Sequence, residues 1–185
     1  TSFLHGAKNG SMGFQGFANT LGYDNYYGRD EFNDDNEYDG FWGIWDEPFL
    51  QFSKSILDNK NEPFLATIFT ITSHEPYIIP DKFKGMFDKG YLPIHKCVGY
   101  TDYSIKQFFK SIEKSNWFEN TIFIFTSDHT NQSYFKYYQS TVNRFAAPLL
   151  IYKKKSGFNG EDNRLASHLD IYPTVAELIG YKKPF

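Results

Sequence analysis

Three short, almost continuous apolar runs constrain the fold of this chain most strongly. They cover residues 64–71 (FLATIFTI), 121–126 (TIFIFT) and 148–152 (PLLIY). Apolar runs of this length, without polar alternation, are typical of strands that are covered on both faces of a sheet. The chain is therefore expected to form a mostly parallel sheet with other elements packed on both of its faces.

Segments with helical periodicity lie between and beyond these runs. Apolar side chains recur at helical spacing over residues 100–115, and further helices are expected over residues 47–57 and 171–179. Asp170 is the expected N-cap of the last helix, and Gly180 follows its end. Strands that alternate with helices predict an α/β domain with helices on both faces of the sheet.

The remaining stretches predict a short helix and two long ordered loops. The helix is expected at residues 13–21, and the loops at residues 22–43 and 133–144, where the first is rich in Asn, Asp, Gly and Tyr. No repeat or flexible linker is visible, so residues 1–185 are expected to belong to a single domain. The apolar, strand-like opening TSFLHG indicates a fragment of something longer.

Composition excludes several classes of protein. With 19 basic and 22 acidic residues the net charge is −3, which argues against a nucleic-acid-binding protein. The single cysteine, Cys97, provides neither a disulfide framework nor a thiolate metal site. No apolar run approaches the roughly 20 residues that a membrane-spanning helix needs. Aromatic residues make up 20% of the chain, which fits either a large core with Tyr-rich loops or stacking on carbohydrate or lipid headgroups.

Polar residues with catalytic potential follow two of the apolar runs. His74 lies just past the first, in TITSHEPY, and Asp128 and His129 lie just past the second, in FIFTSDHT. Ligands of open α/β sheets bind at the carboxyl ends of the strands. An adjacent Asp and His can offer an oxygen and a nitrogen to one divalent cation. By itself the pair is equally compatible with a turn-capping aspartate and an ordinary loop histidine.

The order of the motifs resembles one known family. FLHG, LGYD, GFWGIWDEPF, PFLATIFTITSHEPY, GYTDYSIKQFF, WFENTIFIFTSDHT, APLLIYKK and SHLDIYPTVAELIGY follow one another as in the lipoteichoic acid synthases. That family belongs to the sulfatase-like branch of the alkaline-phosphatase superfamily. The resemblance covers residues 2–181, and it implies the α/β fold of that superfamily. It also implies that residues 1–185 are the carboxy-terminal portion of a single sulfatase-like catalytic domain.

The resemblance also implies roles for particular residues. It makes Asp128 and His129 ligands of a catalytic divalent metal, usually manganese, with zinc, magnesium and calcium as alternatives. It places His74 beside the substrate phosphate as a catalytic residue. His168, in SHLDIYPT, is a weaker candidate for a neighbour of the site.

The segment after HG departs from the family pattern. Lipoteichoic acid synthases use Asp, Trp and Arg there, and the matching positions in this chain are Ala7, Met12 and Phe14. His5 could border the pocket, but packing in the core is an equal expectation. Strict recognition of glycerol phosphate is therefore not expected, and the residues available to bind a substrate in this segment are Lys8, Asn9, Ser11 and Gln15.

The implied function is metal-dependent phosphotransfer, or hydrolysis of a phosphodiester or sulfate ester, on a lipid- or glycan-linked substrate of the cell envelope. The family works on the outer face of the cytoplasmic membrane. Its threonine nucleophile and its membrane anchor lie upstream of FLHG, so residues 1–185 alone are expected to be inactive. Two alternatives remain: a sulfatase, and a non-catalytic module that binds glycans or lipid headgroups.

Overall fold

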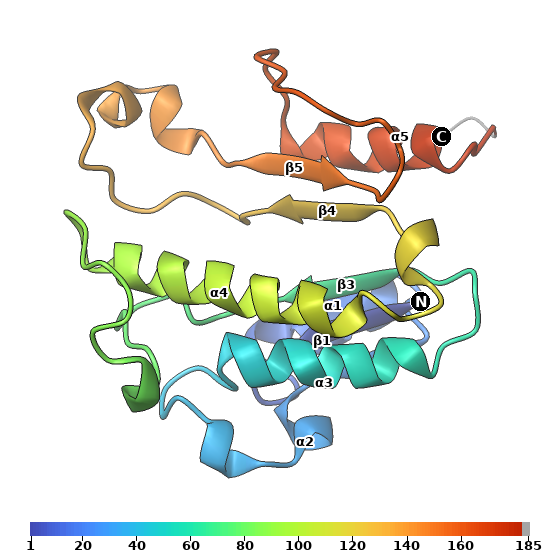
Figure 1. Ribbon diagram of the computed structural model, residues 1–185, viewed down its shortest axis with the longest axis horizontal. Helices are drawn as coiled ribbons and strands as arrows, with labels where there is room; N and C mark the ends of the chain where they lie inside the picture. Colours follow the sequence, from blue (N-terminus) through green and yellow to red (C-terminus); the bar gives the residue numbers. More distant parts are fainter. Residues whose placement is uncertain (183–185) are drawn as a thin grey trace. The chain divides into compact units, whose positions relative to one another are not determined.

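A three-stranded parallel sheet forms the centre of the larger part of the molecule (Figure 1). The computed structural model describes residues 1–182 and contains two compact units, Thr1–Lys155 and a second that begins at Ser156. In the first unit the strand order is β2-β1-β3, with β1 at Ser2–His5, β2 at Asn25–Tyr27 and β3 at Ala66–Phe69. Both pairings are parallel, so the three strands end at the same edge of the sheet.

Alternation along β1 decides which helix covers which face. Phe3 and His5 point to one face, where the Phe14 ring of α1 (Phe14–Thr20) lies 6.0 and 4.8 Å from their rings. Leu4 points to the opposite face and packs in a buried cluster with Ile44 and Phe49. Helices therefore cover both faces of the sheet, as the apolar runs predict.

Helices α3 (Asp46–Asp58) and α4 (Ile94–Ile112) lie side by side on the Leu4 face (Figure 1). Their shared core consists of Leu50, Leu57, Phe108, Ile112, Trp117 and Phe118. The end of α3 is tied to the segment after α4, because Asp58 Oδ1 accepts hydrogen bonds from Ser115 Oγ at 2.7 Å and Trp117 Nε1 at 2.9 Å. The layer of two helices is thus fixed both by apolar burial and by polar contacts at its end.

The second and third apolar runs form a separate antiparallel pair. Strand β4 (Phe123–Thr126) pairs with β5 (Leu149–Tyr152), with Phe123 opposite Tyr152 and Thr126 opposite Leu149. Both strands are shorter than the apolar runs that predict them. Phe123 packs against Phe109 of α4, with 5.0 Å between ring centroids, which connects this pair to the main core.

Other elements differ in extent from the expectation. Helix α4 starts at Ile94 rather than at residue 100. The expected loop at residues 22–43 contains β2 and the short helix α2 (Arg29–Phe32), because pairing with β1 imposes strand geometry on a polar segment. The structure also contains short 3-10 helices at Ser11–Gly13, Asp35–Glu37, Asp81–Phe83, Phe118–Asn120, Lys136–Gln139 and Asn143–Phe145.

The second unit contains helix α5 (His168–Leu178). Its N-cap is Ser167 and not Asp170, which corrects the sequence prediction. Asp170 is instead the third helical residue, and its carboxyl accepts a hydrogen bond from Ser167 N at 2.7 Å in a capping box. This bond holds the pKa of Asp170 below its usual range. No helix within residues 1–182 is both long and apolar enough to span a bilayer.

Candidate functional site

The loops that leave the carboxyl ends of the parallel strands contact one another. Gly6, directly after β1, accepts a hydrogen bond through its carbonyl from Ile44 N at 2.9 Å. Its neighbour Ala7 accepts one from Arg29 N at 2.9 Å and forms an isolated bridge with Gly43. The segments after β1 and β2 are therefore joined at the edge where α/β sheets place their ligand sites.

His74 stands in the loop that follows β3 and is exposed. Its Nδ1 lies 3.1 Å from the carbonyl oxygen of Glu75, so the proton of the neutral ring is held at Nδ1 and Nε2 is the acceptor nitrogen. Its ring packs against the indole of Trp42 at 4.3 Å between centroids. Trp42 Nε1 also donates to the Glu75 carbonyl, so one tryptophan contacts both the ring and the backbone of this loop.

Trp42 is itself held by a tight turn. Asp39 Oδ1 accepts hydrogen bonds from three successive backbone N–H groups, at 2.8 Å from Phe41, 2.8 Å from Trp42 and 3.0 Å from Gly43. Such side-chain-to-backbone bonds fix the turn without a strand or helix. The orientation of Trp42 against His74 therefore has a local cause in the sequence DGFWG.

Asp128 and His129 lie just after β4, and both side chains are exposed. The Nδ1 atom of His129 lies 2.8 Å from the carbonyl oxygen of Thr130, so its proton is held there. Its Nε2 lies 3.4 Å from Asp128 Oδ2. An imidazole nitrogen that carries a lone pair and a carboxylate oxygen thus lie close together.

Side-chain contacts bring the loop after β3 and the loop after β4 together. Asn131 Nδ2 donates to Tyr77 Oη at 2.8 Å, and Tyr77 Oη lies 3.4 Å from a carboxylate oxygen of Glu75. The rings of Tyr91 and Tyr134 stack at 4.0 Å. The structure therefore joins the segment that carries His74 to the segment that carries Asp128 and His129.

Asp128 and His129 offer the types of ligand atom that divalent cations bind. One carboxylate oxygen and one imidazole nitrogen suit manganese, zinc or magnesium. Such ions want four or more ligands, and within residues 1–182 no group of three or more His, Cys, Asp and Glu side chains is placed to hold one ion. A complete shell therefore needs oxygen or nitrogen ligands in addition to this pair.

Comparison with known proteins identifies the family and the fold of the chain. The model of the sulfatase family matches residues 1–181. The chain belongs to the sulfatase family. Two solved structures share its fold: a member of the alkaline phosphatase superfamily from Vibrio parahaemolyticus, with a TM-score of 0.82 and 27% identity, and the lipoteichoic acid synthase LtaP from Listeria monocytogenes, with a TM-score of 0.81 and 20% identity. The α/β fold expected from the motifs is confirmed.

The curated relatives of this sulfatase-family chain include a lipoteichoic acid synthase and a phosphoglycerol transferase. Lipoteichoic acid synthase 1 of Bacillus subtilis (strain 168) is 24% identical over 200 residues, which cover 97% of the chain and 31% of that protein. Phosphoglycerol transferase I of Salmonella choleraesuis (strain SC-B67) is 26% identical over 147 residues, which cover 73% and 19%. The chain also covers only 44% and 50% of the two solved structures, so it spans about half their length or less.

In the segment after HG, two of the three residues that depart from the family pattern take part in apolar packing. Phe14 packs on Phe69 at 5.1 Å between ring centroids, Ala7 is buried, and Met12 is exposed.

The candidates for substrate binding lie in the same segment. Lys8 lines a hollow of about 420 Å³ together with Arg29, which is paired with Asp35 at 2.8 Å. The remaining candidates are Asn9, whose amide donates to both carboxylate oxygens of Glu31 at 2.9 and 3.0 Å, and the half-buried Ser11 and Gln15.

Two other histidines have distinct positions. His168 is the first residue of α5 in the second unit. His5 ends β1 and is 1% exposed between the rings of Phe14 and Phe69. Burial lowers the pKa of His5 from 6.5 to about 4. Of the two expectations for His5, packing in the core is therefore the one that the structure supports.

The buried His5 predicts a pH-dependent stability. Between pH 6.5 and about 4 the unfolded chain binds a proton that the folded His5 does not. The free energy of unfolding should therefore fall as the pH falls through this window, by about 1 kcal/mol per pH unit. Urea unfolding of the wild type and of His5→Asn at pH 7 and pH 5 measures this. An equal loss in both proteins would contradict it, because acidic groups contribute equally to both.

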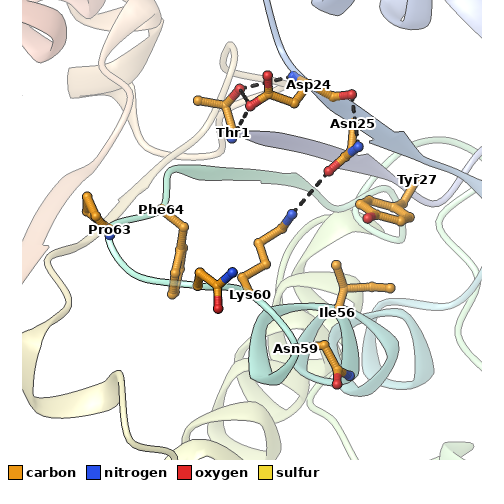
Figure 2. Close-up of a pocket in the computed structure, with 10 residues that line it drawn as sticks. Thr1, Asp24, Asn25, Tyr27, Ile56, Asn59, Lys60, Pro63 and Phe64 are labelled. Atoms are coloured by element: carbon orange, nitrogen blue, oxygen red, sulfur yellow. Dashed lines mark hydrogen bonds and ion pairs between the residues drawn. The ribbon is translucent and has the colours of Figure 1, made fainter.

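A second hollow lies at the opposite end of the sheet (Figure 2). Its volume is about 430 Å³, and Thr1, Asp24, Asn25, Lys60 and Phe64 are among the residues that line it. These residues precede the starts of β1, β2 and β3 or lie beside them. Figure 2 shows that the polar groups bind one another: Lys60 Nζ donates to Asn25 Oδ1 at 3.2 Å. This hollow is therefore separate from the site at the carboxyl ends of the strands.

Proposed function

We propose that the protein containing this chain is a metal-dependent phosphotransferase or phosphodiester hydrolase that acts on lipid- or glycan-linked substrates of the cell envelope. The observation that carries the proposal is the pair of Asp128 Oδ2 and His129 Nε2, which lie 3.4 Å apart next to the loop of His74. Its support from relatives is the similarity to lipoteichoic acid synthase 1 and phosphoglycerol transferase I.

Asp128 and His129 would hold the divalent metal, which we expect to be manganese. A metal bound there would neutralise charge on the phosphoryl oxygens during transfer. The two residues are well prepared for this role, because the Thr130 carbonyl fixes the tautomer of His129 and leaves Nε2 for the cation. The other ligands and the nucleophile are proposed to come from residues of the protein outside this chain.

His74 is proposed to be the catalytic residue that contacts the phosphate ester. Its Nδ1 is engaged by the Glu75 carbonyl, so its Nε2 is the nitrogen that can face a substrate. When protonated, that nitrogen donates a hydrogen bond to a non-bridging oxygen or a proton to the leaving group. Trp42 keeps the ring in place during either task.

Lys8, Ser11 and Gln15 are proposed to contact the headgroup of the substrate. Lys8 contributes a positive charge at the hollow of about 420 Å³, whose lining also contains Arg29, Asp30 and Asp35, and it would bind the anionic oxygens of the ester. Asn9 is proposed to act by orientation, because Glu31 already occupies its amide. With Ala7, Met12 and Phe14 in this segment, we expect the headgroup to differ from glycerol phosphate.

Residues 1–185 are proposed to be the carboxy-terminal portion of a single catalytic domain on the outer face of the cytoplasmic membrane. Support comes from the match of 97% of the chain to 44% of one solved relative and of 98% to 50% of another. His168 is proposed as a peripheral contributor to the same domain. A membrane anchor would belong to another part of the protein.

The test is hydrolysis of bis(p-nitrophenyl) phosphate by the natural protein that contains this chain. We expect release of nitrophenol that requires manganese, that stops when a chelator is added and that returns when manganese is restored. Nitrophenyl sulfate, assayed in parallel, separates a sulfatase from a phosphodiesterase. A protein that turns over neither ester, yet binds glycans or lipid headgroups, would overturn the proposal in favour of a binding module.

A further inference from the structure

Asp46 is a buried carboxyl group with no place in the proposed chemistry. It is the first residue of α3 and is 0% exposed. Its Oδ1 accepts hydrogen bonds from Ile71 N and Thr72 N, both at 3.0 Å, and its Oδ2 accepts one from Thr101 Oγ1 of α4 at 2.7 Å. Its backbone N–H donates to Thr72 Oγ1 at 3.1 Å. A buried carboxyl is costly unless it is hydrogen-bonded, and both oxygens of this one accept hydrogen bonds.

The two backbone N–H groups bound by Asp46 lie just after the end of β3, where the loop that carries His74 begins. Strand β3 ends at Phe69, so Ile71 and Thr72 are beyond the reach of its ladder. The next turn begins at once, because His74 N donates to Ile71 O at 3.1 Å. The direction in which the loop leaves the sheet, and hence the place of His74, is therefore set by the carboxyl of Asp46 where strand pairing no longer acts.

Trp42, which packs against the His74 ring, is also connected to Asp46. Trp42 and Asp46 belong to one short segment, whose Ile44 N is fixed to Gly6 O at 2.9 Å. Trp42 is therefore connected to Asp46 through the few residues between them in the chain. His74 is connected to Asp46 through Ile71 and Thr72, whose N–H groups bind its carboxyl. Asp46 is the point where both sides meet, and Thr101 secures it from α4.

We propose that Asp46 is a positioning residue of the candidate site, which sets His74 against Trp42 by fixing the backbone of Ile71 and Thr72. Asp46 touches neither metal nor substrate in this role and acts through His74. Its effect on turnover rests on the proposed function of His74, whereas its effect on the position of His74 does not.

The positional part is tested by NMR on the natural protein that contains this chain, labelled with ¹³C-histidine, with the His74 signal assigned from His74→Gln. In Asp46→Ala we expect that signal to shift and its nuclear Overhauser effect to the Trp42 indole to be lost. Thr101→Val, a milder change that removes only the hydroxyl at Asp46 Oδ2, should shift it in the same direction by less. Asp46→Asn keeps an oxygen that can accept from Ile71 and Thr72 and should restore most of the wild-type signal.

The matched control is Asp58→Ala. Asp58 is the last residue of the same helix, and its carboxyl also binds two donors from another segment, Ser115 and Trp117. Its loss should lower the melting temperature without moving the His74 signal. An unchanged His74 signal in folded Asp46→Ala or Thr101→Val, or an equal shift in Asp58→Ala, would overturn the proposal.

The functional part is tested with a double-mutant cycle in the natural protein. Asp46→Ala should lower kcat for bis(p-nitrophenyl) phosphate by about 10- to 100-fold, as misplacement of a catalytic group does, with little change in KM. In the His74→Gln background the same change should have almost no further effect. Multiplicative losses would overturn the claim that Asp46 acts through His74. If His74→Gln alone changes nothing, the proposed role of His74 fails, and the NMR result still decides the positional claim.

Discussion

Replacement of Asp128 by alanine in the natural protein is expected to lower manganese-dependent hydrolysis of bis(p-nitrophenyl) phosphate by more than about 100-fold. The loss of a residue that only orients a metal ligand already costs 10- to 100-fold in affinity or activity, so loss of a ligand should cost more. The substitution removes the oxygen that lies 3.4 Å from His129 Nε2 and leaves a single donor on this loop. Initial rates measured over a range of manganese concentrations would show the loss and any partial rescue by excess metal.

His129→Ala should reproduce this loss, since it removes the other donor of the pair. The control is Asp162→Ala, which removes an exposed carboxyl that pairs with Arg164 in the second unit. That variant should retain wild-type activity. Wild-type rates in both Asp128→Ala and His129→Ala would mean that the pair holds no catalytic metal, and the metal-ester chemistry would have to be abandoned.

Gly43→Ala is expected to lower the free energy of unfolding by about 3 kcal/mol or more, the upper end of what overpacking costs. A Cβ atom at position 43 would overlap the carbonyl of Gly6 and lie 2.7 Å from Ile71 Cδ1. The carbonyl belongs to a backbone that is fixed by Ile44, so it has no room to retreat. Urea unfolding followed by circular dichroism measures the difference.

The control for this prediction is the same substitution at Gly16. Gly16 lies within α1, and apart from the backbone of its own helix and its chain neighbours no atom of the described residues lies within 4 Å of where its Cβ would be. Gly16→Ala should stabilise the protein by roughly 0.5–1 kcal/mol, because alanine loses less backbone entropy in a helix. Equal unfolding midpoints for Gly43→Ala and the wild type would contradict the close backbone approach at the Gly6–Gly43 contact.

The elements that could be predicted from the sequence are those with a strong local pattern. The apolar runs locate β3, β4 and β5, and helical spacing locates α3 to within a residue at each end. Strand β2 was missed, because NYY in a polar stretch has no pattern of its own and is a strand only through pairing with β1. The antiparallel pairing of β4 with β5 was equally invisible, since direction is decided by the connection and not by the strands.

The residues of the candidate site also divide into those with a local sequence pattern and those placed by distant contacts. Motifs at the strand ends indicate His74, Asp128 and His129, and the structure places all three on loops that contact each other. Asp46 and Trp42 were missed as site residues, because their partners lie 25 to 33 positions away in the chain. The only local signal for Asp46 is an acidic residue at the start of a helix, which is far more often a simple response to the helix dipole.

The partition of the strands into two sheets has a mechanical consequence. Within residues 1–182, the loop of His74 leaves one sheet and the loop of Asp128 and His129 leaves the other. At the rim they are joined by side chains, through the bond of Asn131 to Tyr77 and the stack of Tyr91 on Tyr134. Such contacts contribute about 1 kcal/mol each. These contacts are independent of the strand pairing, so the two loops could separate at the rim while the backbone hydrogen bonds of both sheets stay intact.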